Sequence, residues 1–350
     1  MAKDSKDQEQ LTLATAELRK YFQQDPSFYV VGGIATNSGG MVLVEVQQLL
    51  PNGQVRELVV KRALQGAEHI VQRVVLNPDP LQKPLPGEQT GITGPYLVME
   101  KLRLGTLDAF IRKFAEAPYP IPNRVLWAIF LSLIKACIAM AWPPQQPDNS
   151  PTTDETVGEG PPVNLMHLDI SPFNIMHDFP SSEKDIIPRL KLIDFGHSRI
   201  NGGKDYVYKE DVGYHENVYR IGKVMLSLIF RDPCAQIVQT APVDLPAVDG
   251  GTTRVGVDWG RSGDPTAEIP GLDRDLHALV ILCLVARPSQ RPTLPSLLAQ
   301  ARVGAARTRD DYIQMGSPYY ELENDELIAN VMNYVFRDGK PPVPDAESAG

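Results

Sequence analysis

Three polar residues in two neighbouring segments of the sequence could perform chemistry together. Asp169 and Asn174 lie within residues 167–176, and Asp194 lies within residues 192–196. A carboxylate such as Asp169 can orient an acceptor hydroxyl and take its proton, and the side-chain oxygens of Asn174 and Asp194 are hard ligands of the kind that Mg²⁺ prefers. Phosphoryl transfer from a nucleotide requires mainly such a carboxylate and such metal ligands from the protein. The sequence therefore predicts Asp169, Asn174 and Asp194 as catalytic residues, the last two as metal ligands.

Short strands and a buried helix are expected to position these side chains. Residues 190–193 are mainly apolar and predict a buried strand that ends at Asp194. Asn174 follows Asp169 by five residues, which is far enough around a short loop for its amide oxygen to face the same cavity. The most apolar stretch, residues 126–142, contains polar residues and is shorter than a bilayer span, so it predicts a buried helix before the loop.

The two segments, in this order and spacing, resemble the catalytic motifs of the eukaryotic protein kinase superfamily. The resemblance extends along most of the chain. Residues 96–102 resemble the last strand of the small lobe and the hinge, and residues 59–61 resemble the strand that carries a phosphate-binding lysine. Residues 218–230 resemble the central helix of the large lobe, and residues 283–298 resemble the helical end of the domain.

The resemblance implies which residues would contact ATP. Lys61 would grip the α and β phosphates as a point charge, Met99 would be the gatekeeper, and the backbone of Glu100 and Leu102 would meet adenine. An irregular glycine-rich loop would cover the phosphates. The implied ATP-binding residues are Gly33, Gly40, Val42, Lys61, Met99, Glu100 and Leu102. His167 would pack against Phe195 and fix the catalytic loop.

Substitutions at three positions depart from the family pattern. Leu168 replaces an arginine that reads activation-loop phosphate, and Asn217 replaces an aspartate that ties the central helix to the catalytic loop. Ser171 stands where a lysine or arginine steadies the transferring phosphoryl group, so the transition state loses an electrostatic partner.

Two segments are also shorter than in the family. Only 16 residues separate Lys61 from Pro78, which leaves no room for a full regulatory helix. Only 22 residues separate Asp194 from Asn217, and they contain no Ala-Pro-Glu, so Arg291 is expected to lack its usual glutamate partner. The chain thus resembles a divergent kinase without the regulatory helix and part of the activation segment.

Composition predicts a soluble intracellular protein. The formal charge of −9 disfavours nucleic acid as a partner, because nucleic-acid-binding proteins cluster Lys and Arg. Three widely spaced cysteines favour a reducing compartment over a disulfide framework. Residues 1–6 are polar and charged, so no secretory signal is predicted. We expect a cytoplasmic or nuclear location and no membrane or nucleic-acid partner.

The predicted fold class is α+β, with a bilobal kinase-like fold: a small antiparallel β lobe and a larger, mainly helical lobe. Two Pro-rich segments predict disordered insertions. Apolar spacing between residues 327 and 335 predicts a tail helix packed on the large lobe. The expected organisation is a helical extension over residues 1–26, a small lobe over 27–100, a large lobe over 101–310 with disordered insertions at about 143–162 and 242–268, and a tail over 311–350.

The predicted function is ATP-dependent, Mg²⁺-dependent phosphorylation of serine or threonine in an unknown protein substrate, at a low rate. One alternative is a pseudokinase, a nucleotide-binding or interaction module without turnover, which the shortened segments favour. A second alternative is a small-molecule phosphotransferase of the aminoglycoside or choline kinase type, which shares part of the motif. Residues 291–293 and the full Asp-Phe-Gly at 194–196 disfavour this last class.

Overall fold

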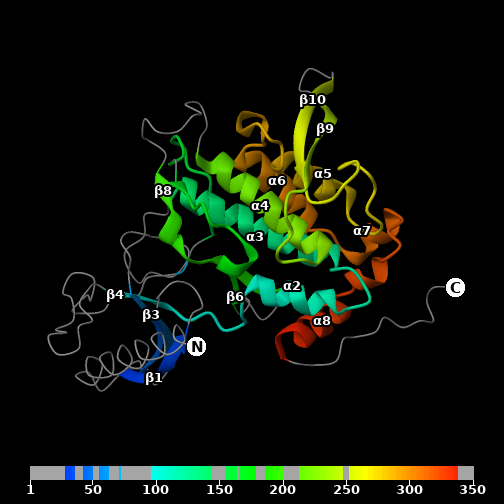
Figure 1. Ribbon diagram of the computed structural model, residues 1–350. Helices are drawn as coiled ribbons and strands as arrows, with labels where there is room; N and C mark the ends of the chain where they lie inside the picture. Colours follow the sequence, from blue (N-terminus) through cyan, green and yellow to red (C-terminus); the bar gives the residue numbers. More distant parts are fainter. Residues whose placement is uncertain are drawn as a thin grey trace, which may run out of the picture. The chain divides into compact units, whose positions relative to one another are not determined.

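The protein is of the α+β class, with helices and small antiparallel sheets (Figure 1). The computed structural model describes residues 28–35, 42–49, 55–62, 71, 96–143, 154–163, 165–178, 186–200, 213–246 and 252–337. The chain divides into two compact units. The first ends at Lys101 and also takes in residues 145–153, and the second contains the remainder from Leu102 onward. The expected helical extension over residues 1–26 lies outside the described residues.

The first unit holds one four-stranded antiparallel sheet, in the order β1-β2-β3-β4. Its strands are β1 (Phe28–Ala35), β2 (Val42–Leu49), β3 (Val55–Arg62) and β4 (Tyr96–Glu100). Branched and aromatic residues dominate these strands, as suits a pleated sheet. β2 pairs with β3 in an antiparallel ladder, and the turn between them lies outside the described residues.

The second unit is built mainly from helices around α3 (Asn123–Ala141). This helix packs on α4 (Gly213–Phe230) and α6 (Leu294–Ala305). The remaining helices are α2 (Leu107–Ala115), α5 (Arg274–Cys283), α7 (Arg309–Gln314) and α8 (Asp325–Arg337). Within the described part of the chain, α3 alone is long and apolar enough to cross a membrane, but 67% of its apolar window is buried. It is the buried helix predicted from residues 126–142.

Two small sheets carry the segments that hold the candidate catalytic residues. β5 (Leu165–Met166) pairs with β8 (Arg199–Ile200), and β6 (Ile175–Asp178) pairs with β7 (Arg189–Leu192). Two 3₁₀ turns complete the segments: η1 spans Pro172–Asn174 and η2 spans Phe195–His197. The strand predicted before Asp194 is confirmed as β7.

The prediction of a disordered insertion over residues 242–268 is wrong for the described residues 242–246 and 252–259, which form strands. β9 (Gln239–Pro246) and β10 (Thr252–Trp259) form an antiparallel hairpin, drawn in yellow in Figure 1. Val255, Val257 and Trp259 alternate with less buried residues and supply the hairpin's apolar face. The prolines of β9 are tolerated because this strand pairs on one side only, in a two-stranded sheet.

The predicted disorder over residues 143–162 stays a prediction, and the structure describes residues 143 and 154–162 of this segment without a helix or strand. Residues 154–163 fold back on the end of α3, where the Trp142 indole donates to the Gly160 carbonyl and the Val163 amide donates to the Ala141 carbonyl. Lys135 on α3 forms an ion pair with Asp154. Prolines and glycines lack local periodicity, but a large aromatic side chain can still hold them by packing.

The tail packs on the second unit as predicted. Ile328, Val331 and Met332 of α8 are buried, and this helix contacts α2. A preceding 3₁₀ turn, η4 (Tyr320–Glu323), places the carboxylate of Glu323 at the N-terminus of α3. There it accepts from the Asn123 amide at 2.8 Å and the Arg124 amide at 3.0 Å, and so satisfies backbone donors that Pro122 cannot cap.

Candidate functional site

The pairing of β6 with β7 brings Asn174 and Asp194 into one small region. Ile175 lies opposite Leu192, so the start of β6 faces the end of β7. The Ile193 amide donates to the Asn174 carbonyl at 2.9 Å. The two predicted metal ligands therefore lie at the same end of a short antiparallel ladder.

Asp169 and Asn174 are locked together by the Asn174 side chain. Its amide nitrogen donates to the Asp169 carboxylate at 2.7 Å and to the Asp169 carbonyl at 3.0 Å. Both partners can only accept, so the nitrogen must face them and the Asn174 amide oxygen must point elsewhere. The amide that restrains the candidate base thus keeps its own oxygen for another partner, such as a cation.

His167 holds the loop that carries Asp169 through a neutral imidazole ring. Its side chain is fully buried, its Nδ1 accepts from the Asp169 amide at 3.2 Å, and its Nε2 lies 3.1 Å from the Ile193 carbonyl. Because Nδ1 accepts, Nε2 carries the proton and donates to Ile193. Burial lowers the pKa of His167 to about 4, so the ring is uncharged near neutral pH. It meets the Phe195 ring edge to face at 4.5 Å, which confirms the predicted packing.

The backbone is strained beside both carboxylates. Leu168 has φ 62° and Asp194 has φ 64°, and both belong to the left-handed region that residues other than glycine rarely occupy. In the described part of the chain only Arg231 shares this property among non-glycine residues. The Asp194 carboxylate also accepts from the Gly196 amide at 3.3 Å and caps η2.

Asn217 ties α4 to the loop that carries Asp169, at a position where the kinase resemblance predicts an aspartate. It is fully buried, its amide oxygen accepts from the His167 amide at 3.0 Å, and its amide nitrogen donates to the Leu165 carbonyl at 2.9 Å. In the sequence analysis, Asn217 was noted only as a departure from the kinase pattern. Its side-chain amide carries both a donor and an acceptor, and this property could have indicated that it joins two segments.

Arg291 also binds the start of α4. Its guanidinium donates to the carbonyls of Val285, Ala286 and His215, at 2.7, 3.1 and 2.9 Å, and lies over the Tyr219 ring. These backbone acceptors satisfy a nearly buried charge.

The predicted ATP contacts lie mainly on the sheet of the first unit. Lys61 occupies β3, opposite Leu97 of β4 and Leu43 of β2. Gly33, Val42, Met99 and Glu100 lie on β1, β2, β4 and β4, and Gly40 lies outside the described residues. Leu102 is buried at the start of the second unit. Asp169, Asn174 and Asp194 all belong to that second unit.

The donor set near Asp194 suits a cation that shares its coordination with a phosphate. Among the described residues, no group of three or more His, Cys, Asp or Glu side chains forms a metal site. Mg²⁺ in nucleotide sites, however, is usually held by one or two protein oxygens together with phosphates and water. One amide oxygen and one carboxylate fit this pattern, so Asn174 and Asp194 remain the candidate ligands.

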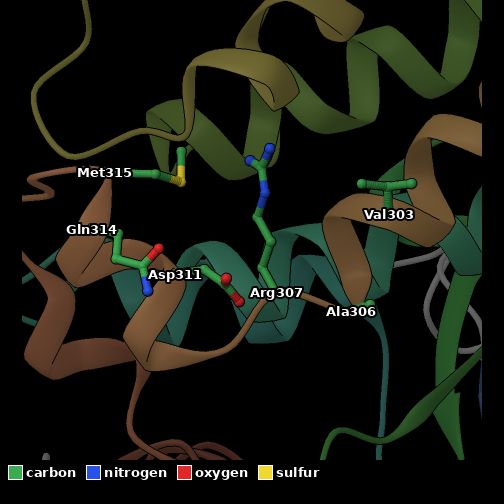
Figure 2. A pocket seen from close by; sticks show the side chains of 6 residues that line it. All are labelled: Val303, Ala306, Arg307, Asp311, Gln314 and Met315. Carbon is green, nitrogen blue, oxygen red and sulfur yellow. The ribbon is translucent and has the colours of Figure 1, made fainter.

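A surface hollow of about 360 Å³ lies outside the site, at the junction of α6 and α7. Figure 2 shows the side chains that line it: Val303, Ala306, Arg307, Asp311, Gln314 and Met315. Arg307 is already paired with Asp273 and Asp275, and Asp311 caps α7. These polar side chains therefore serve the fold.

No protein-family model matches the chain, and no curated protein matches it in sequence. The functional interpretation therefore rests on the residues of the site.

Proposed function

We propose that the chain is a divergent, bilobal, kinase-like phosphotransferase that binds ATP with Mg²⁺ and transfers the γ-phosphoryl group slowly to serine or threonine of a protein. One observation carries this proposal. The Asn174 side chain bonds to Asp169 while its backbone bonds to Ile193, the neighbour of Asp194. A candidate base and two candidate metal ligands are thereby held on one rigid framework.

Each residue then has a distinct role. Asp169 orients the acceptor hydroxyl and accepts its proton. Asn174 and Asp194 hold Mg²⁺, which neutralises the phosphates when bound. Lys61 contacts the phosphates, and the backbone of Glu100 and Leu102 contacts adenine. His167, neutral and buried, keeps the loop in shape without entering the chemistry.

A low rate is expected because part of the electrostatic support is missing. Ser171 brings a hydroxyl where a cationic side chain would stabilise the transferring phosphoryl group, and the short segment between Asp194 and Asn217 offers little surface for docking a protein acceptor. Acceptor capture should suffer more than nucleotide binding. ATP affinity should therefore be nearer to that of an ordinary kinase than the transfer rate is.

Transfer of labelled phosphate to a generic basic protein tests the chemistry. Asp169→Asn keeps the shape of the side chain and an acceptor for Asn174, but removes the charge that takes the proton, so it should abolish transfer. Asp264→Asn is a matched control, because Asp264 is exposed and far along the chain from the catalytic loop. Equal transfer by the unmodified protein and Asp169→Asn would overturn the kinase proposal. An Asp169-dependent rate of roughly 1 to 100 per second would contradict the expected impairment.

Nucleotide binding tests the metal site separately. ATP should raise the melting temperature more with Mg²⁺ than with a chelator, and Asp194→Asn should erase most of the difference, because an amide brings no charge to the metal. Asp178→Asn is the matched control on the neighbouring strand β6. If ATP stabilises the protein equally with and without Mg²⁺, the assignment of Asn174 and Asp194 as ligands is wrong.

A pseudokinase is the second candidate. The neutral side chain at Ser171 and the shortened segments favour binding without turnover. Mg²⁺-dependent ATP binding combined with no Asp169-dependent transfer would support this class.

A further inference from the structure

Asp258 on β10 uses one carboxylate oxygen to anchor the hairpin to α4 and the other to join the two strands of the hairpin. One oxygen accepts from the Tyr219 hydroxyl of α4 at 2.8 Å, and the other accepts from the Thr240 hydroxyl of β9 at 2.6 Å. Its backbone amide donates to the Leu284 carbonyl just after α5, at 3.0 Å. Burial raises the pKa of Tyr219, so its hydroxyl stays protonated and remains the donor. One residue of the hairpin therefore joins three other elements.

Tyr219 extends this contact to the first turn of α4. Its ring lies 4.5 Å from the Arg291 guanidinium, which donates to the His215 carbonyl at 2.9 Å. His215 belongs to the first turn of α4, directly after the segment that follows Asp194 in the chain. Asp258, Tyr219 and Arg291 thus restrain one side of the start of this helix.

Asn217 restrains the opposite side of the same helix. Residues two apart on a helix are about 200° apart around its axis, so Asn217 and Tyr219 face nearly opposite directions. Asn217 accepts from the His167 amide and donates to the Leu165 carbonyl, and His167 accepts from the Asp169 amide. The backbone of α4 between Asn217 and Tyr219 therefore links the contacts of the hairpin to the hydrogen bonds around the candidate base.

We propose that Asp258, acting through Tyr219, is a positioning residue for the catalytic loop. By fixing the first turn of α4 from outside, it keeps Asn217 in register with His167 and so keeps Asp169 in place. The hairpin then does more than cover apolar surface. The catalytic consequence rests on the proposed function, whereas the effect on the loop is independent of it.

Hydrogen exchange of the catalytic loop measures this effect without any assay of activity. Tyr219→Phe removes only the hydroxyl and leaves the ring under Arg291. A hydrogen bond to a charged group is worth enough that exchange of the amides in residues 165–170 should rise about tenfold. Tyr312→Phe is the matched control, because the Tyr312 hydroxyl also donates to an aspartate, Asp273, at 3.1 Å. Neither Tyr312 nor Asp273 belongs to the contacts that link Asp258 to Asp169.

A merely structural role would raise exchange throughout the second unit by similar factors in both variants. The proposal is overturned if exchange in residues 165–170 is unchanged in Tyr219→Phe, or if Tyr312→Phe raises it equally. Asp258→Leu should reproduce Tyr219→Phe, and Asp258→Asn, which keeps an acceptor for the hydroxyl, should restore most of the protection. These two variants also decide the matter should Tyr219→Phe fail to fold.

Transfer kinetics separate this inference from the proposed function. If the protein is an active phosphotransferase, Tyr219→Phe should lower kcat several-fold and leave the KM for ATP unchanged. Absence of Asp169-dependent transfer in the unmodified protein would refute the proposed function, and the exchange measurement would still accept or reject the role of Asp258.

Discussion

Asn217→Asp should make the stability of the protein strongly dependent on pH. The substitution preserves the shape of the side chain and introduces the residue that the kinase resemblance leads one to expect. In this structure, however, the Asn217 amide nitrogen donates to the Leu165 carbonyl at 2.9 Å, and the residue is fully buried. A carboxylate would set an oxygen against that carbonyl, with one donor, the His167 amide, to compensate its charge.

The cost follows from the two options open to the introduced carboxyl. If it stays ionised, it loses a hydrogen bond and buries a charge with a single donor, at a cost of several kcal/mol. If it takes up a proton, its hydroxyl can donate to Leu165, but protonating an ordinary aspartate at pH 7 costs about 4 kcal/mol. At pH 4.5 the same protonation costs about 1 kcal/mol. We therefore expect a loss of about 3 to 4 kcal/mol at pH 7 and about 1 kcal/mol at pH 4.5.

The sign is fixed by the direction of the pKa shift. Burial beside a carbonyl raises the pKa of the introduced carboxyl above its value in the unfolded chain. Stability is then retained below the unfolded pKa and lost as the pH rises toward the folded one. An aspartate at position 217 should therefore reduce the free energy of unfolding little in acid and strongly near neutral pH.

Urea unfolding at several pH values between 4.5 and 7.5, followed by tryptophan fluorescence, measures the difference from the unmodified protein. The three tryptophans all lie in the second unit and so report on the body that contains Asn217. Asn333→Asp provides the control, because it adds the same charge at an exposed position of α8 and should give a difference that does not change with pH. A pH-independent loss in Asn217→Asp would show that the amide nitrogen does not face the Leu165 carbonyl.

Three further changes probe the fold that supports the site. Burial raises the pKa of Glu323 above its ordinary value of 4.5, so its contribution to stability is lost as the pH rises above that value, and Glu323→Gln should flatten this part of the unfolding free-energy profile. Gly304→Ala should cost about 1 to 3 kcal/mol in urea unfolding, because a Cβ there meets the Trp127 ring at 2.3 Å, whereas Gly160→Ala, with no atom within 4 Å, should cost little. Burial lowers the pKa of His177 from 6.5 to about 3, so the protein should lose stability as the pH falls below about 6.5, and His177→Phe should reduce that loss in the same titration.

The sequence by itself determined the elements whose signals are local. The apolar run before Asp194 predicted the strand β7, and the apolar run over residues 126–142 predicted the core helix α3. The spacing of Asp169 and Asn174 also places both side chains on one loop, and the structure adds that the Asn174 amide nitrogen donates to the Asp169 carboxylate. Each of these predictions depends on residues that are neighbours in the chain.

The prediction from composition failed where a segment packs on residues that are distant in the chain. Pro242 and other turn-forming residues predicted disorder, yet β9 and β10 form a hairpin because Val257 pairs beside Val285 and Asp258 bonds to Tyr219, 39 residues away. Local sequence favours turns in the hairpin segment, and burial of Val255, Val257 and Trp259 overrides that preference.

Only the tertiary structure decided how the site is held. Asn217 lies 50 residues from His167 along the chain, and Glu323 lies 200 residues from the α3 backbone amide that it accepts from. Neither contact leaves a periodic trace, because a hydrogen bond between distant segments depends on where the folded backbone places one donor and one acceptor. The residue types predicted phosphoryl-transfer chemistry. The packing of α4 against the loop that carries Asp169 determined which atoms hold that loop in place.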